Sequence, residues 1–201
     1  MDYFFSIEKE GVNEFKDRGS RFIANAFPLE KVEDFKSKLQ IIKKEHPKAV
    51  HHCFAYRIGL TGDMYRVSDD GEPSGSAGKP ILGQIDSKKI INVAIIVTRY
   101  FGGTLLGVPG LINAYKTASS LVLQTIPIVQ KPVMIAYHIE FDYTIINEIM
   151  QVLKQCQCEV VDREINLFSG IKCNVPKIKE NETIFRLNQL KGVSVKKILL
   201  S

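Results

Sequence analysis

Several features that would assign a protein to a class are scarce or missing from this sequence. Its 201 residues include four cysteines, and the Cys156-x-Cys158 spacing matches neither a redox pair nor a usual zinc site. We therefore expect reduced cysteines, as in a cytosolic protein. The first residues lack a basic segment followed by an apolar one, so no secretion signal is expected. No uninterrupted apolar run approaches the ~18 residues that a membrane span needs, which predicts a cytoplasmic protein without a membrane partner.

An excess of charge of one sign is also missing. The net charge is +5, with 17 basic against 14 acidic residues over 1–130 and 10 against 8 over 131–201. This even spread gives weak support for nucleic-acid binding, because surfaces that bind a phosphate backbone are usually strongly basic. The hydrophobic fraction of 45% is ordinary for a globular protein, so burial of a core is expected.

The order of the expected elements divides the chain near residue 130. Over residues 1–130, apolar periodicity predicts strands at 4–7, 12–15 and 20–27, a helix at 30–46, a hairpin of strands at 50–58 and 63–68, a short helix from Pro80, a buried strand at 93–97 and a helix at 111–124. After a linker at Lys131-Pro132, the pattern predicts a strand at 133–141, a helix capped by Asp142, strands at 158–165 and 171–175, a helix at 181–190 and a strand at 193–200. This second order, βαββαβ, is the ferredoxin-like one. The predicted fold class is α+β in two domains, 1–130 and 131–201.

A glycine-rich loop follows the buried strand. Gly102-Gly103 ends the strand, and Gly107 and Pro109-Gly110 precede the helix. A helix N-terminus facing such a loop favours an anion, because its backbone N–H groups are free and the helix dipole is positive there. Neither a Walker motif nor G-x-G-x-x-G can be drawn through the loop, so the sequence does not identify the anion.

A second unusual loop runs over residues 69–80. It packs three acidic residues, three glycines and two prolines into twelve positions, which predicts a turn-rich loop. Its carboxylates lack the spacing of an EF-hand. We expect aspartate side chains that accept hydrogen bonds from backbone N–H groups, and no metal site.

The two adjacent histidines in the hairpin are expected to have different roles. If Ile58 pairs with Asp63, the register places His52 across from Asp69 and His51 across from Asp70. Neighbouring strand residues face opposite sides, so the two histidines cannot serve one site. His52 lies on the apolar face and is expected to be a core histidine bonded to the following turn. His51 and Arg57, on the more polar face, are the better functional candidates.

Five motifs carry a resemblance to a known family. They are Ser20-Arg21-Phe22, Ala49-x-His51-His52-Cys53-x-Ala55-Tyr56-Arg57, Ser68-Asp69-Asp70-Gly71-Glu72-Pro73-Ser74-Gly75, Ala77-Gly78-x-Pro80-Ile81-Leu82 and Arg99-Tyr100-Phe101-Gly102-Gly103. Through them nearly the whole chain resembles the IMPACT family of bacterial YigZ type. The resemblance implies a first domain like the second domain of a small-subunit ribosomal protein and domain IV of elongation factor G. It implies a second domain like domain V of that factor, and a role in translation: eukaryotic relatives bind a large activator of a translation-initiation kinase and so restrain the stress response.

The sequence departs from the family pattern after Gly103. Leu105 stands where that pattern has lysine, and Asn113 stands where it has arginine. Each phosphate contact that is lost should reduce the salt dependence of nucleic-acid binding by about one unit. Whatever this loop binds is therefore expected to be less anionic, or to be held by fewer contacts.

The expected binding site is a cleft between the Arg99–Gly103 turn and the loop from Asp69 to Lys79, with Arg57 and Lys79 as its remaining cations. The candidate residues are His51, Arg57, Asp69, Asp70, Glu72, Ser74, Lys79, Arg99, Tyr100, Gly102, Gly103 and Tyr115. No catalytic residue is assigned, because neither Ser74 nor Ser76 has an identifiable base partner. No metal or cofactor is assigned either.

Three functions follow from these expectations. The leading one is a cytosolic, translation-linked regulatory protein that binds RNA, the ribosome or a translation factor. The second is a protein-interaction module without nucleic-acid affinity, which the missing cations favour. The third is an enzyme that acts on a small phosphorylated ligand. The ferredoxin-like part implies neither RNA nor protein binding by itself.

Overall fold

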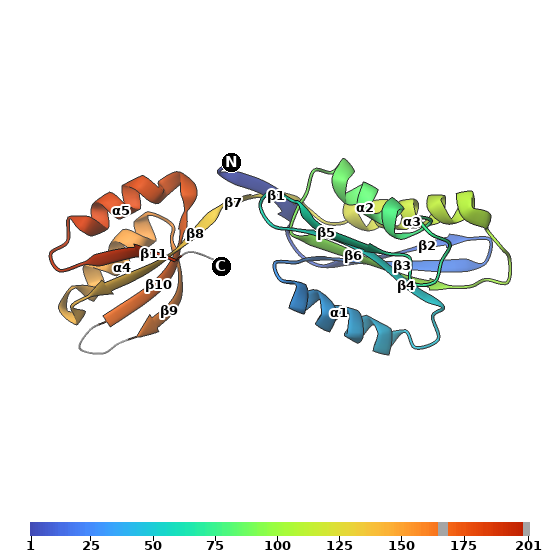
Figure 1. Ribbon diagram of the computed structural model, residues 1–201, viewed down its shortest axis with the longest axis horizontal. Helices are drawn as coiled ribbons and strands as arrows, with labels where there is room; N and C mark the ends of the chain where they lie inside the picture. The colour runs from blue at the N-terminus through green and yellow to red at the C-terminus, as the bar shows by residue number, and fades with distance from the viewer. Residues whose placement is uncertain (165–168, 199–201) are drawn as a thin grey trace. The chain divides into compact units, whose positions relative to one another are not determined.

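The computed structural model describes residues 1–164 and 169–198. The chain divides into two compact units, and each is described by itself below. The first runs from Phe4 to Lys131, and the second begins at Pro132 and includes Met1–Tyr3. Both combine sheets with helices, which confirms the α+β class (Figure 1). Among the described residues, no helix has the length and apolar character that crossing a membrane requires.

The first unit is built on a five-stranded antiparallel sheet in the order β2-β3-β6-β4-β5. Its strands are β2 (Gly11–Asp17), β3 (Ser20–Pro28), β4 (His51–Ile58), β5 (Met64–Ser68) and β6 (Val93–Tyr100). Helix α1 (Val32–Glu45) covers one face, while α2 (Gly78–Ser87) and α3 (Gly107–Gln124) cover the other (Figure 1). Two further strands, β1 (Tyr3–Ile7) and β7 (Ile128–Pro132), form a separate two-stranded sheet.

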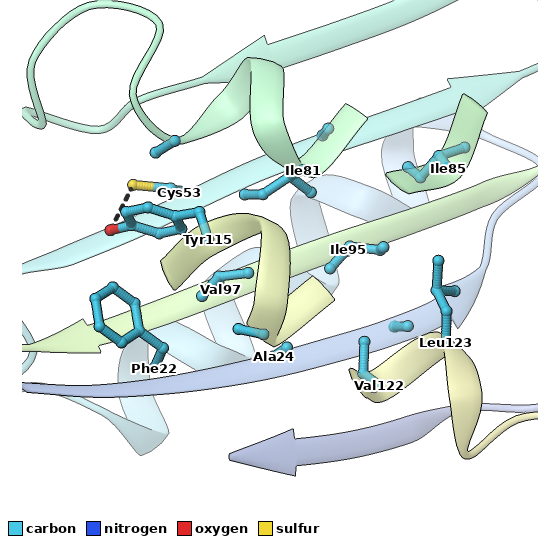
Figure 2. Close-up of a cluster of buried hydrophobic side chains, with 14 of the residues drawn as sticks. Phe22, Ala24, Cys53, Ile81, Ile85, Ile95, Val97, Tyr115, Val122 and Leu123 are labelled. Carbon is cyan, nitrogen blue, oxygen red and sulfur yellow. Dashed lines mark hydrogen bonds between the residues drawn. The ribbon is translucent and has the colours of Figure 1, made fainter. Parts of the chain in front are cut away.

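The central strand β6 explains why the expected strand at 93–97 lacks polar alternation. The first seven of its residues are buried, because helices cover both faces of the sheet. Ala94 and Ile96 pack in the core beneath α1, whereas Val93, Ile95 and Val97 pack in the core beneath α2 and α3. Figure 2 shows the second core, with Ile95 and Val97 beneath side chains of the two helices.

The hairpin register differs by one residue from the expected one. Ile58 pairs with Met64 rather than with Asp63. The turn contains two glycines with positive φ, Gly59 and Gly62, and the Gly62 N–H donates to the Gly59 carbonyl at 3.0 Å. This compact turn takes in Asp63, which the expected register had placed in the strand. The residues of β4 alternate between two faces as expected, with Cys53 and Ala55 in the core beneath α2 and α3 and Phe54 in the core beneath α1. The face that was expected to be more polar is therefore also part of a buried core.

Several element boundaries also differ from expectation. Helix α2 begins at Gly78, two residues before Pro80, and α3 begins at Gly107. Pro109 therefore lies inside the first turn of α3, where the missing N–H of proline costs no helical hydrogen bond. Lys131 and Pro132, expected to form a linker, are the last residues of β7.

The second unit has the ferredoxin-like order βαββαβ. Its elements are β8 (Met134–Phe141), η1 (Tyr143–Ile145), α4 (Ile146–Gln155), β9 (Glu159–Glu164), β10 (Ser169–Pro176), η2 (Lys177–Lys179), α5 (Glu180–Asn188) and β11 (Ser194–Lys197). The strands pair antiparallel in the order β11-β8-β10-β9, which confirms the predicted ferredoxin-like arrangement. The expected strand ends at Ile165 and Leu200 lie outside the described residues.

Capping at the start of the first helical segment of this unit is also confirmed. The Asp142 carboxylate accepts a hydrogen bond from the Thr144 N–H at 2.9 Å. Ile149 and Leu153 of α4 then bury their side chains against Ile139 and Ile171 of the sheet. The period of the α4 stripe thus predicted both the helix and its buried face.

Candidate functional site

A buried carboxylate lies where four segments of the first unit meet. Glu72, on the loop after β5, accepts hydrogen bonds at Oε1 from Arg99 Nη1 at 2.6 Å and from the Tyr115 hydroxyl at 2.7 Å. Only 3% of the Glu72 side chain and 7% of the Arg99 side chain are exposed. His51 completes the group, with Nε2 3.8 Å from Glu72 Oε2. We call His51, Glu72, Arg99 and Tyr115 the Glu72 cluster.

Strand pairing brings the members of this cluster together. His51 of β4 is the register partner of Arg99 of β6, so their side chains lie next to each other on the face beneath α3. Tyr115 reaches the same place from α3, and its ring packs edge-on against Phe22 at 5.2 Å (Figure 2). The Arg99 guanidinium lies 5.5 Å from the centre of the Phe22 ring. Aromatic packing therefore fixes both hydrogen-bond donors of Glu72.

Tyr115 is a fixed donor in this network. Burial raises the pKa of the Tyr115 hydroxyl, and burial also raises the pKa of the neighbouring Cys53 thiol. Cys53 Sγ lies 3.3 Å from the Tyr115 hydroxyl oxygen (Figure 2). Both groups stay protonated at physiological pH, so the Tyr115 hydroxyl keeps the proton that it donates to Glu72.

Asp69 holds the loop that carries Glu72. Its carboxylate accepts hydrogen bonds from three backbone N–H groups, those of Gly75 at 2.8 Å, Ala77 at 3.0 Å and Gly78 at 2.8 Å. Burial alone would raise the pKa of Asp69, but these three donors hold it below its ordinary value. The expected hydrogen bonding of aspartate side chains to backbone N–H groups is confirmed.

His51 has a defined tautomer. Its Nδ1 lies 2.7 Å from the Asp70 carbonyl oxygen, which can only accept, so Nδ1 carries a proton. The remaining nitrogen, Nε2, faces Glu72. His52, on the other face, is 7% exposed, and burial lowers its pKa. Its backbone N–H donates to Asp70 Oδ2 at 2.7 Å, so its bond to the turn comes from the backbone.

A pocket of about 370 Å³ opens above the Glu72 cluster. His51, Glu72 and Arg99 form its polar part, and its other lining residues are Val50, Pro73, Phe101, Leu105, Leu106, Gly107, Val108 and Leu111. Several of these apolar side chains are exposed, and Leu105 reaches 82%. The first turn of α3 forms one wall. We call this cavity the α3 pocket.

Arg57 does not reach the α3 pocket. It pairs with Val93 on β6, six residues along β4 from His51, which is about 20 Å at the usual rise of a strand. Its guanidinium contacts Asp86 at 2.8 Å and lies over the Tyr65 ring at 5.1 Å. The expected cleft with Arg57 as a cation is therefore not formed. Arg57 lies on the same face of β4 as His51, but at the opposite end of the strand from the pocket.

The other predicted site residues divide between the pocket and the framework. Tyr100 faces α1, where its hydroxyl lies 3.0 Å from His46 Nδ1. Ser74 and Lys79 are exposed. Gly102 allows a close approach of chains, since a Cβ atom there would lie 1.9 Å from the Gly19 carbonyl carbon. Gly103 has φ +85°, which favours glycine.

The apolar mouth of the pocket was not predicted. Phe101, Leu105 and Val108 are 47%, 82% and 45% exposed, although all three are large and apolar. The sequence held one signal for this surface, namely large apolar residues within a glycine-rich loop, where solvent-exposed polar residues are more usual. Clusters of exposed apolar side chains of this kind mark interaction sites.

Comparison with known proteins covers both units. Residues 18–123 match the family model of the Impact N-terminal domain. IMPACT family member YvyE of Bacillus subtilis (strain 168) is 36% identical over 154 residues, which make up 77% of this chain and 71% of that protein. IMPACT family member YigZ of Escherichia coli (strain K12) is 33% identical over 81% of each chain. A solved structure titled as a hypothetical protein covers both chains completely, with a TM-score of 0.79 and 27% identity.

Proposed function

The chain belongs to the IMPACT family, and from this premise we propose that it is a translation-linked regulatory protein that binds a protein partner through the α3 pocket. The link to translation rests on the family. The choice of a protein partner rests on the site.

The choice of a protein partner depends on one observation, namely that the arginines of the expected site are held in ion pairs. Arg99 is neutralised by Glu72 at 2.6 Å, and Arg57 is neutralised by Asp86 at 2.8 Å. Leu105 and Asn113, at the positions where the family pattern has basic residues, are exposed and uncharged. Binding of a phosphate backbone depends on lysine and arginine side chains that are available to the phosphates. The pocket offers none that is both exposed and unpaired.

The shape of the site supports the same choice. A hollow bordered by exposed apolar side chains, with a buried polar group at its base, resembles the places where one anchoring side chain of a partner protein binds. Val50, Phe101, Leu105 and Val108 supply the apolar border. A translation factor or a protein of the ribosome fits this description better than bare RNA does.

Co-purification with and without nuclease tests the proposal. The tagged full-length chain should recover one identified translation factor or ribosomal protein in a stoichiometric amount, and nuclease treatment should not release it. Sedimentation with ribosomes at low and high salt gives the second measurement. Association through a protein contact should persist at high salt, whereas release by nuclease or by moderate salt would favour RNA. Recovery of no translation component under any of these conditions would reject the proposal.

A further inference from the structure

The N-terminus of α3 lines the pocket without a side-chain cap. Among residues 1–164 and 169–198 no side-chain cap is found at this helix start, where Leu106 occupies the cap position with helical φ and ψ. The N–H groups of Gly107 and Val108 have no acceptor within the helix, because the first four N–H groups of any α-helix lack one. Both residues line the pocket. This wall therefore offers hydrogen-bond donors at the positive end of an 18-residue helix.

Arg99 gives a second, independent indication of a ligand. Its side chain is 93% buried, since 7% is exposed. Nη1 donates to Glu72, but the buried Nε–H has no hydrogen-bond partner in the part of the chain that the structure describes. The guanidinium lies 5.8 Å from the centre of the Phe101 ring, at the mouth of the pocket. A buried donor without a partner is unfavourable, and Nε is closed to solvent in this conformation. A small movement of the Arg99 side chain that turned Nε–H toward an acceptor oxygen in the pocket would therefore be stabilised.

The charges in the pocket limit the kind of acceptor. Glu72 is already compensated by Arg99 and Tyr115, with His51 3.8 Å away. One guanidinium Nε–H and a helix N-terminus remain for a ligand, and the rest of the wall is apolar. This suits a group with one negative charge better than a phosphate with two. A volume of about 370 Å³ is near the lower end for ligand pockets, so it accommodates a single side chain and its polar group.

We propose that the α3 pocket binds a carboxylate joined to an apolar side chain, as presented by an acidic and apolar peptide segment of a partner protein. The carboxylate accepts hydrogen bonds from Arg99 Nε–H and from the first-turn N–H groups of α3. The apolar side chain packs against Phe101, Leu105 and Val108. This assignment rests on the proposed function, because it specifies the chemistry of the partner at the same site.

An NMR titration of the full-length chain tests the assignment with two small probes. N-acetyl-L-phenylalanine carries the carboxylate, and N-acetyl-L-phenylalanine amide has the same apolar group without the charge. The acid should shift the ¹H–¹⁵N signals of Arg99 Nε–H, Gly107 and Val108 together. The amide should bind about tenfold more weakly, since it lacks the charge-assisted hydrogen bonds.

Two opposite substitutions at one exposed position supply matched variants. Both Leu105→Glu and Leu105→Lys lose the apolar contact of Leu105 with the probes, so the two variants should bind the amide with equal affinity. They differ in charge alone, so Leu105→Lys should bind the acid at least about fourfold more tightly than Leu105→Glu does, as expected for an exposed charge pair. Leu105 is 82% exposed, so both variants should fold.

Three results with the two probes would overturn the assignment. These are equal affinities for the acid and the amide, shifts confined to signals outside the pocket, and no shift up to the solubility limit of either probe. Inorganic phosphate serves as the competing anion, and equal binding of phosphate at these same signals would also reject it. The titration contains no translation component. Its failure therefore leaves the co-purification result standing, and failure of co-purification leaves the ligand chemistry standing.

Discussion

Glu72 connects the loop after β5 with β6 and α3. Its partners Arg99 and Tyr115 are 27 and 43 residues away in sequence, so no local pattern could pair them. In the sequence, Glu72 reads as one more acidic residue of a polar loop. Its burial follows from the tertiary fold, because Arg99 and Tyr115 compensate its charge only when β6 and α3 are packed together.

Removal of the Glu72 charge tests how much the buried Glu72–Arg99 pair contributes to stability. Glu72→Gln leaves the Arg99 guanidinium buried without a counter-charge, which should lower the free energy of unfolding by about 3–5 kcal/mol. Urea denaturation measures the loss. The double variant Glu72→Gln/Arg99→Met removes both charges and should recover most of the stability. A loss below about 1 kcal/mol for the single variant would show that the pair is not buried in solution.

Asp69 predicts a pH dependence of stability. Its pKa is lower in the folded protein than its ordinary value of 3.8, although burial opposes this, because Gly75, Ala77 and Gly78 donate to the carboxylate. A carboxyl group with a lowered folded-state pKa contributes stability that is fully present above its unfolded-state pKa. That contribution is lost as the pH falls through the folded-state pKa.

Asp69→Asn should therefore be less stable than the wild type at pH 7, and the difference should narrow below about pH 4. Urea denaturation at a series of pH values gives both curves. A difference that stays constant to the lowest pH at which the protein folds would mean that the carboxylate charge is not what holds the loop.

Among the elements, β6 and α1 were predictable and the hairpin register was not. The apolar run of β6 is typical of a buried strand, and α1 presents Phe35 and Ile42 at helical spacing. The β4–β5 register depends on the conformation of five turn residues with two positive-φ glycines, Gly59 and Gly62. The one-residue error in the register did not affect the assignment of residues to the two faces of β4. His51 and His52 are neighbours on one strand, so they face opposite sides whatever residue lies across from them.

Replacement of two different glycines by alanine should change the free energy of unfolding in opposite directions. Gly102→Ala would place a Cβ atom 1.9 Å from the Gly19 carbonyl carbon and 2.2 Å from Ser20 N, so the end of β6 must move away from β3. We expect a loss of about 2–3 kcal/mol in the free energy of unfolding. Gly83→Ala, within α2 and facing open space, is the matched control and should stabilise by up to about 1 kcal/mol.

Chemical denaturation of the two variants provides the comparison. Equal stabilities would contradict the close chain approach at Gly102, whereas a large loss confined to Gly102→Ala supports it. The same measurement separates a structural glycine from a ligand-contacting one, because no ligand is present.

For the whole molecule, the sequence predicted the fold class and the family but placed the site too widely. The ferredoxin-like order in the second unit followed from periodicity and helix caps alone. The expected cleft combined residues of one strand face, yet Arg57 and His51 are six positions apart on β4. Pattern gives the face of a residue, whereas its position along the strand relative to a pocket depends on which loops close over that end.

The net charge of +5 overstates how many cations are available to a ligand, because some arginines are held in ion pairs. Arg57, one of the two predicted cations of the cleft, and Arg99, another predicted cleft residue, are held in ion pairs at 2.8 and 2.6 Å. Net charge counts such residues as though they were available to a ligand. The exposed surface at the α3 pocket is apolar instead, with Leu105 and Val108 at its mouth. This favours a protein partner over nucleic acid.

Recovery of the partner by variants at the pocket mouth measures whether the α3 pocket is where the partner binds. The tagged wild type, Leu105→Glu and Val12→Glu should be compared in the nuclease-treated co-purification. Val12 is the matched control, since it is an exposed apolar residue on β2, 62% exposed, and is not part of the pocket lining. We expect at least about a tenfold loss of partner for Leu105→Glu, as for a charge placed in a binding hot spot, and wild-type recovery for Val12→Glu. Equal recovery of the partner by all three proteins would show that the partner does not bind at the α3 pocket.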